Sequence, residues 1–117
     1  MGESFGIVTI HPSVLSTVAR LTALATPGVA RMSDRRRLSA GRMINRPGCG
    51  GGVDLSIADN AVTMDLYVVA EPEANLLRLG QTLQNEVNRA IFEMAGMEVL
   101  AVNVHIQDVG FPLSSRH

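Results

Sequence analysis

Val53-Asp-Leu-Ser-Ile-Ala-Asp-Asn-Ala-Val-Thr-Met-Asp-Leu-Tyr-Val68 is the stretch that decides the fold. Apolar and polar residues alternate on both sides of Asp59-Asn60, with the period of a strand that buries one face. Asp and Asn tolerate the backbone of a tight turn. The pattern therefore predicts a β-hairpin with one apolar face and one mixed face.

The segment that follows the hairpin predicts a helix and a last strand. Asn75 can cap a helix whose apolar residues recur at three- and four-residue steps, namely Leu76, Leu79, Leu83, Val87, Ala90 and Met94. Gly96 suits the left-handed cap at the end of this helix. Alternation from Leu100 to Gln107 then predicts a strand.

The segment before the hairpin predicts one more strand and one more helix. Phe5-Gly-Ile-Val-Thr-Ile10 is rich in β-branched residues and predicts a first strand. A helix from Pro12 to Ala25 follows, with an apolar stripe of Val14, Val18, Leu21 and Ala25 and with Leu15 beside it. The whole order is β-α-β-β-α-β, which predicts an α+β two-layer sandwich of ferredoxin-like topology. Two helices would cover one face of a four-stranded, mainly antiparallel sheet.

Length and composition favour one globular domain over residues 1–117. We expect its core in residues 5–109, an Arg/Gly-rich loop at 31–52 and a short tail at 110–117. Cys49 is the only cysteine, which fits a reducing compartment. The sequence contains neither a signal peptide pattern nor the run of about 18–20 apolar residues that crosses a bilayer. We therefore expect a cytoplasmic protein whose membrane contact, if any, is peripheral.

The charge is unevenly distributed along the chain. Residues 31–46 hold six arginines and one acid, a net charge of +5, whereas the remainder has a net charge of −6. Guanidinium groups suit phosphate, so this loop is a candidate site for anionic lipid, nucleic acid or an acidic partner. The alternative is that this loop is simply solvated and folds back on the acidic remainder of the chain. The six arginines are Arg31, Arg35, Arg36, Arg37, Arg42 and Arg46.

Several kinds of chemistry are disfavoured by the residues present. A phosphate-binding loop of the Walker type needs a lysine, and the chain has none. His11, His105 and His117 have no Cys, His or carboxylate at the spacing of metal ligands. Cys49 lies among glycines without a neighbouring base. We expect no catalytic residues, no metal, no cofactor and no small-molecule substrate.

The mixed face of the predicted sheet and its last strand form a candidate self-association surface. Stacked bases need aromatic rings on an open sheet face, and here one tyrosine beside an acid makes a poor platform. The last strand is long and should lie at a sheet edge, where no Pro or Lys blunts its unpaired backbone groups. Edge pairing between subunits is therefore the predicted route to an oligomer. The residues of this surface are Asp65, Tyr67, Asn103, Val104, His105 and Gln107.

Three sequence blocks resemble the alkaline shock protein family, the Gls-type envelope stress response proteins of bacteria. The first is Gly6-Ile-Val-Thr-Ile10 with the following helix as far as Pro27-Gly-Val29. The second is Val62-Thr-Met-Asp-Leu-Tyr-Val-Val69. The third is Gly96-Met-Glu-Val99 leading into Val102-Asn-Val-His-Ile-Gln-Asp-Val109. The arginine-rich loop departs most from the family pattern.

The resemblance implies a non-enzymatic, cytoplasmic, membrane-proximal protein linked to cell-envelope homeostasis. It implies self-association in some members and a membrane-protein partner in others. The leading hypothesis is thus a structural or adaptor protein that forms a homo-oligomer and meets a membrane-protein partner or an anionic lipid surface. The alternative is a small nucleic-acid-binding module that uses the arginine loop.

Overall fold

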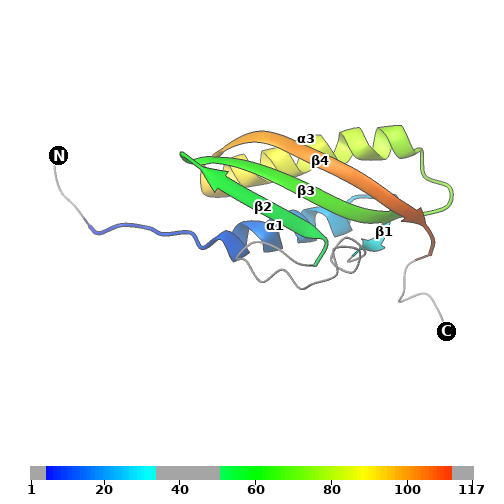
Figure 1. Cartoon of the computed structure of the whole chain (residues 1–117), viewed down its shortest axis with the longest axis horizontal. Helices are drawn as coiled ribbons and strands as arrows, with labels where there is room; N and C mark the ends of the chain where they lie inside the picture. The colour runs from blue at the N-terminus through cyan, green and yellow to red at the C-terminus, as the bar shows by residue number, and fades with distance from the viewer. Residues whose placement is uncertain (1–4, 34–50, 112–117) are drawn as a thin grey trace.

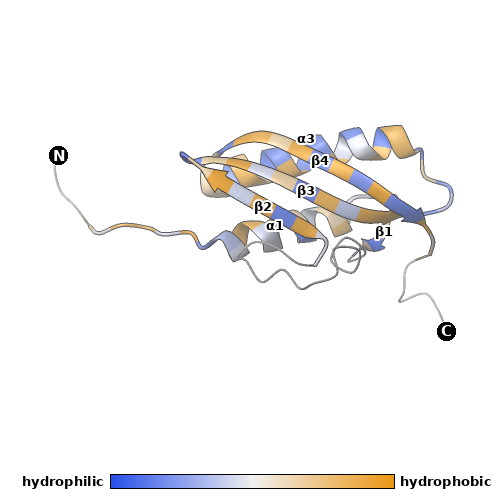
Figure 2. Cartoon of the chain, in the orientation of Figure 1, coloured by the Kyte–Doolittle hydropathy of each residue, from blue (hydrophilic) through white to orange (hydrophobic). Residues whose placement is uncertain are grey.

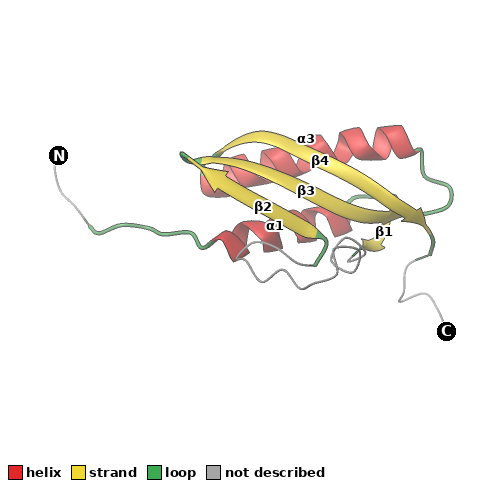
Figure 3. Ribbon diagram, viewed as in Figure 1, coloured by secondary structure: helices red, strands yellow, loops and turns green. Residues whose placement is uncertain are grey.

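The fold consists of two layers, a sheet and a pair of helices on one of its faces (Figure 1). The structure is a computed structural model and describes residues 5–33 and 51–111. The helices are α1 (Pro12–Ala25) and α3 (Leu76–Ala95). The strands are β1 (Val29–Met32), β2 (Val53–Ala58), β3 (Ala61–Ala70) and β4 (Glu98–Val109), as Figure 3 shows by colour. The predicted fold class is confirmed.

The long strand β3 lies in the middle of the sheet. On one side β2 pairs antiparallel with residues 61–66, and β1 pairs antiparallel with residues 68–70. On the other side β4 runs parallel to β3 along its whole length. Strands β1 and β2 therefore share one side of β3 in tandem, and β4 takes the other side alone.

The hairpin of β2 and β3 is confirmed, turn included. Asp59 and Asn60 have φ angles of 53° and 64° and lie between the paired residues Ala58 and Ala61. A two-residue turn with positive φ at both positions matches the twist of the strands that it joins. The Asp-Asn dipeptide therefore fixes the register that separates the two faces of the sheet.

Residues 5–10 are not a strand, so this prediction was wrong. The segment is extended but unpaired and projects from the start of α1 (Figure 1). The reason is that both sides of β3 are already occupied, one side by β4 and the other by β1 and β2. The first strand is instead the short β1, which follows α1 in the chain.

The helices bury stripes that differ in part from the predicted ones. In α1 the buried residues are Leu15, Ala19 and Ala23. Val14 and Leu21 are exposed, because the small alanines let the other side of the helix approach the sheet. In α3 the buried stripe is Leu79, Leu83, Val87 and Ile91, whereas the predicted Leu76 and Met94 are exposed. Burial of each Leu, Val or Ile side chain in these stripes contributes about 1.5–3 kcal/mol to folding.

The predicted caps of α3 are confirmed. The Asn75 side chain accepts a hydrogen bond from the Arg78 N–H at 3.0 Å. At the other end Gly96 has a φ of 69°, and its N–H donates to the Phe92 carbonyl at 2.9 Å. Both caps satisfy backbone groups that the helix leaves without partners. They hold α3 in place against β4, which begins two residues after Gly96.

Candidate functional site on the open sheet face

The face of the sheet opposite the helices carries the polar residues that the sequence singled out. Buried residues of β3 point toward the helices, and the residues between them point the other way. In the register of β3 and β4, Asp65 lies beside Asn103 and Tyr67 lies beside His105. The structure therefore brings these four residues together. Figure 2 shows the alternation of apolar and polar residues along β3 and β4.

His105 is held by two contacts with the neighbouring strand. Its Nε2 lies 3.0 Å from the Oδ1 of Asp65. Its ring is stacked on the ring of Tyr67, with the centroids 4.6 Å apart and the planes 11° apart. Cross-strand pairs of this kind stabilise a sheet and fix its side chains. The three residues form an ordered polar patch, on which the imidazole is oriented without being buried.

Asp54 belongs to the same face but was missed in the sequence. It is buried to 9% exposure and lies directly opposite Asp65 in the hairpin register. Carboxylates at opposite positions repel each other, and the contact of His105 with Asp65 offsets part of this cost when the imidazole is protonated. The alternation of Val53, Asp54 and Leu55 already placed Asp54 on this face. Its burial had no sequence signal.

The other two predicted surface residues lie apart from this patch. Gln107 accepts a hydrogen bond from the Ser33 hydroxyl at 3.1 Å, next to the end of β1. The Val104 side chain packs against the core, on the helix side of the sheet. Only the backbone of Val104 is therefore available at the strand edge.

The predicted arginine site is described at one position. Arg31 lies in β1, and its Nη1 donates to the Phe111 carbonyl at 3.2 Å. This contact ties β1 to the segment after β4. The other five residues lie outside the described residues, namely Arg35, Arg36, Arg37, Arg42 and Arg46.

The outer edge of β4 is the longest strand edge of the sheet. β4 has 12 residues and pairs with β3 on one side. Its only Asp and Glu residues are Glu98 and Asp108, near the two ends, and it contains neither Pro nor Lys. The Gln84 side chain of α3 donates to the Val102 carbonyl at 3.1 Å. Natural proteins usually protect such an edge with charge, proline or a covering segment.

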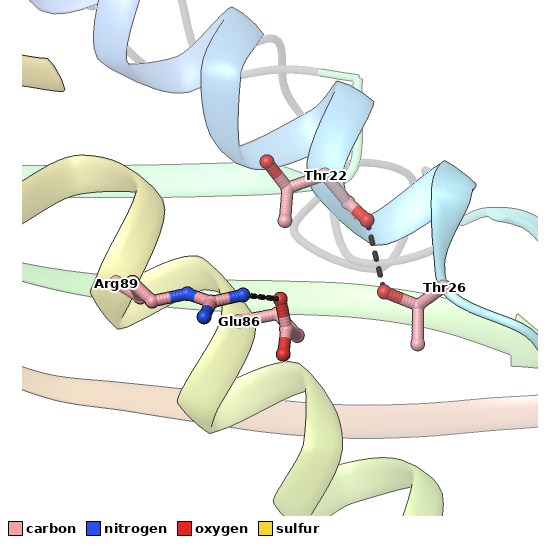
Figure 4. A network of polar contacts seen from close by, with 4 residues as sticks. All are labelled: Thr22, Thr26, Glu86 and Arg89. Atoms are coloured by element: carbon pink, nitrogen blue, oxygen red, sulfur yellow. Dashed lines mark hydrogen bonds and ion pairs between the residues drawn. The ribbon is translucent and has the colours of Figure 1, made fainter. Parts of the chain in front are cut away.

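A groove between the helices lies on the opposite side of the molecule. It has a volume of about 490 Å³ and is lined mainly by residues from the end of α1 and the middle of α3. Figure 4 shows two polar contacts beside it, in which Thr26 donates to the Thr22 carbonyl at 2.9 Å and Arg89 pairs with Glu86 at 2.9 Å. Each contact stays within one helix or its cap. Neither contact brings reactive groups together.

Over residues 5–33 and 51–111, no three His, Cys, Asp or Glu side chains form a group that could hold a metal ion. Neither of the described helices is long and apolar enough to cross a membrane.

Fold and surface together define the class, a small two-layer α+β domain with an ordered polar sheet face and a long strand edge. The model of the alkaline shock protein 23 family, described by a cell envelope-related function, matches residues 1–111, and the chain belongs to this family. The resemblance seen in the sequence is thereby confirmed.

The chain is similar to proteins of two bacteria and, in its fold, to a solved structure. The chain is 24% identical to the uncharacterized protein YqhY of Bacillus subtilis over 106 residues, which cover 91% of this chain and 78% of that protein. It is 26% identical to the uncharacterized protein Spy1535 of Streptococcus pyogenes, with 92% and 81% covered. A variant of MamM CTD in its zinc form superposes with a TM-score of 0.50 over 81% of this chain and 82% of that chain. With 9% sequence identity, this likeness shows the fold alone.

Proposed function

We propose that this protein is a non-enzymatic structural or adaptor protein of the cell envelope, which self-associates through the outer edge of β4. The single observation that carries the proposal is this 12-residue edge, which has no Asp, Glu, Arg or Lys between Glu98 and Asp108. Unpaired N–H and C=O groups along a strand bind another strand with little demand on its side chains. Strand pairing of this kind suits a structural or adaptor protein.

The polar patch supports assembly better than catalysis. The contacts of His105 with Asp65 and Tyr67 lie on a sheet face, whereas the groove of about 490 Å³ lies on the helix side. A histidine that is half-exposed and stacked on a tyrosine offers a rigid, amphipathic contact point. Such rings lose little conformational entropy when a partner covers them. We propose that this patch borders the self-association surface.

The same face argues against the nucleic-acid alternative. One side of the Tyr67 ring is already stacked on His105. Asp54 and Asp65 add negative charge beside it, which repels phosphate. The proposed role remains the one at the cell envelope, and we propose that the protein lies in the cytoplasm, peripheral to the inner face of the membrane. Its arginine loop would meet an anionic lipid surface or a membrane-protein partner.

The experiment that tests self-association is the mass in solution over a concentration series. The native chain should gain mass with concentration, and Val104→Pro should stay monomeric because proline removes a donor from the edge. Ser56→Lys on the exposed side of β2 is the matched control and should assemble like the native chain. A folded Val104→Pro variant with unchanged mass would refute the proposal.

A further inference from the structure

Residues 5–10 form an apolar, strand-forming arm that is not paired in its own sheet, and its last residue, Ile10, packs partly against the core where the arm joins α1. Phe5, Ile7 and Val8 are 97%, 89% and 90% exposed. Five of its six residues, all but Gly6, are β-branched or aromatic, which favours strands. Figure 2 shows apolar residues along this arm, which projects from α1. Soluble proteins rarely leave so many large apolar side chains in water within one short segment.

The arm starts on the side of the sheet that lies away from β4. α1 contacts β1 and β2, whereas α3 contacts β4. The His11 side chain accepts a hydrogen bond from the Ser13 N–H at 3.4 Å and so fixes where the arm leaves the helix. In Figure 1 the arm points away from the body of the molecule. A second copy can therefore contact this arm, and the arm need not pass over its own sheet to reach that copy.

The outer edge of β4 has the backbone groups to accept such an arm. The Val102 carbonyl bonds to the Gln84 side chain, which indicates that this carbonyl is directed away from β3. Backbone groups of alternate residues in a strand point to the same side, so Val104 and Ile106 also present theirs at the outer edge. Six residues of an arm span about 20 Å, which fits well within the length of β4.

Apolar surface of α3 flanks the same edge. Leu77 precedes Gln84 by seven residues, or two turns, and so lies on the same side of the helix. Leu77 is exposed, and a Cβ added at Gly80 would find open space. At the other end of the edge, Leu100 of β4 is exposed as well. An added strand would lay every second side chain against this flank, and the phase that holds Phe5 and Ile7 supplies two exposed apolar ones there.

We propose that residues 5–10 of one copy add as a fifth strand to the outer edge of β4 of a second copy. The proposal rests on the self-association proposed above and names the segment that fills the edge. The donor and the acceptor are different surfaces, so each copy can give its arm to one neighbour and receive the arm of another. If two β4 strands paired directly, both copies would use the same surface for one contact, and assembly would end at a dimer.

A mixing experiment with two full-length variants separates these cases. The arm variant carries Ile7→Asp and Val8→Asp, and the edge variant carries Val104→Pro. Each variant alone should be monomeric by light scattering, at a concentration where the native chain is assembled. An equimolar mixture should form a complex of twice the monomer mass, because the intact arm of the edge variant fits the intact edge of the arm variant.

The controls distinguish this proposal from the function on which it rests. Both variants must keep the native circular dichroism spectrum, and Asn103→Lys replaces Val104→Pro if the proline variant does not fold. A mixture that stays monomeric overturns the arm proposal, and so does an arm variant that assembles like the native chain. If the arm variant assembles like the native chain but the edge variant is monomeric, the proposal of self-association through β4 still stands. If both variants assemble like the native chain, the proposed function fails as well.

Discussion

At the scale of single residues, the open face depends on how closely the strands meet. Gly52 lies just before β2, and its carbonyl accepts a hydrogen bond from the Tyr67 N–H at 2.8 Å. Its φ is 86°, and an added Cβ would lie 2.8 Å from the Met32 Cβ and 2.9 Å from the Tyr67 carbonyl oxygen. A glycine is therefore required where β1, β2 and β3 converge. The position of Tyr67, and with it the stacked His105, depends on this contact.

This contact predicts that Gly52→Ala strongly destabilises the protein. Left-handed strain and the clash with Met32 and the Tyr67 backbone should together lower the free energy of unfolding by about 3 kcal/mol. Urea denaturation measures the change. Gly51→Ala is the matched control, since its φ is 63° and its added Cβ meets only the flexible Arg20 side chain. The control should lose about 1 kcal/mol, and equal losses in the two variants would contradict this account of Gly52.

At the scale of elements, the sequence predicted what local rules determine. The Asp59-Asn60 turn, the caps of α3 and the bounds of α1 follow from residues that act within a few positions. The candidate patch was also predictable in part. Alternation assigned Asp65, Tyr67 and His105 to one face, although their mutual contacts depend on the register of β3 and β4.

The errors concern competition between distant segments. Residues 5–10 have the composition of a strand, and residues 29–32 form one instead. Local propensity cannot choose between them, because the outcome depends on which segment reaches the free end of β3 beside β2. The stripe of α1 shows the same limit, since larger residues suggested the wrong side of the helix. Propensity is a weak guide wherever packing decides.

At the scale of the whole molecule, the charge of the sequence separates into a basic segment and an acidic remainder. Residues 31–46 carry a net charge of +5 against −6 elsewhere. Basic residues near anionic lipid contribute about 1 kcal/mol each. If the protein assembles as proposed, the arginine-rich segments of several copies would bind an anionic membrane with combined strength.

This distribution predicts salt-sensitive binding to anionic vesicles. The native chain should sediment with phosphatidylserine vesicles at low salt but not with neutral vesicles. Replacing Arg35, Arg36 and Arg37 with glutamine should weaken this binding by about 3 kcal/mol, or roughly a hundredfold. Replacing the paired Arg89 on α3 with glutamine is the control and should leave binding unchanged. Absence of binding by the native chain would leave a protein partner as the target of the loop.

The central claim is that the outer edge of β4 becomes buried when copies of this protein assemble. Amide hydrogen exchange, measured residue by residue at a dilute and a concentrated condition, tests it most directly. We expect the amides of Val104 and Ile106 to exchange fast in the dilute sample and at least tenfold more slowly on assembly, while the amides of β2 keep their rates. An assembly confirmed by its mass, in which Val104 and Ile106 exchange as fast as in the monomer, would contradict the claim.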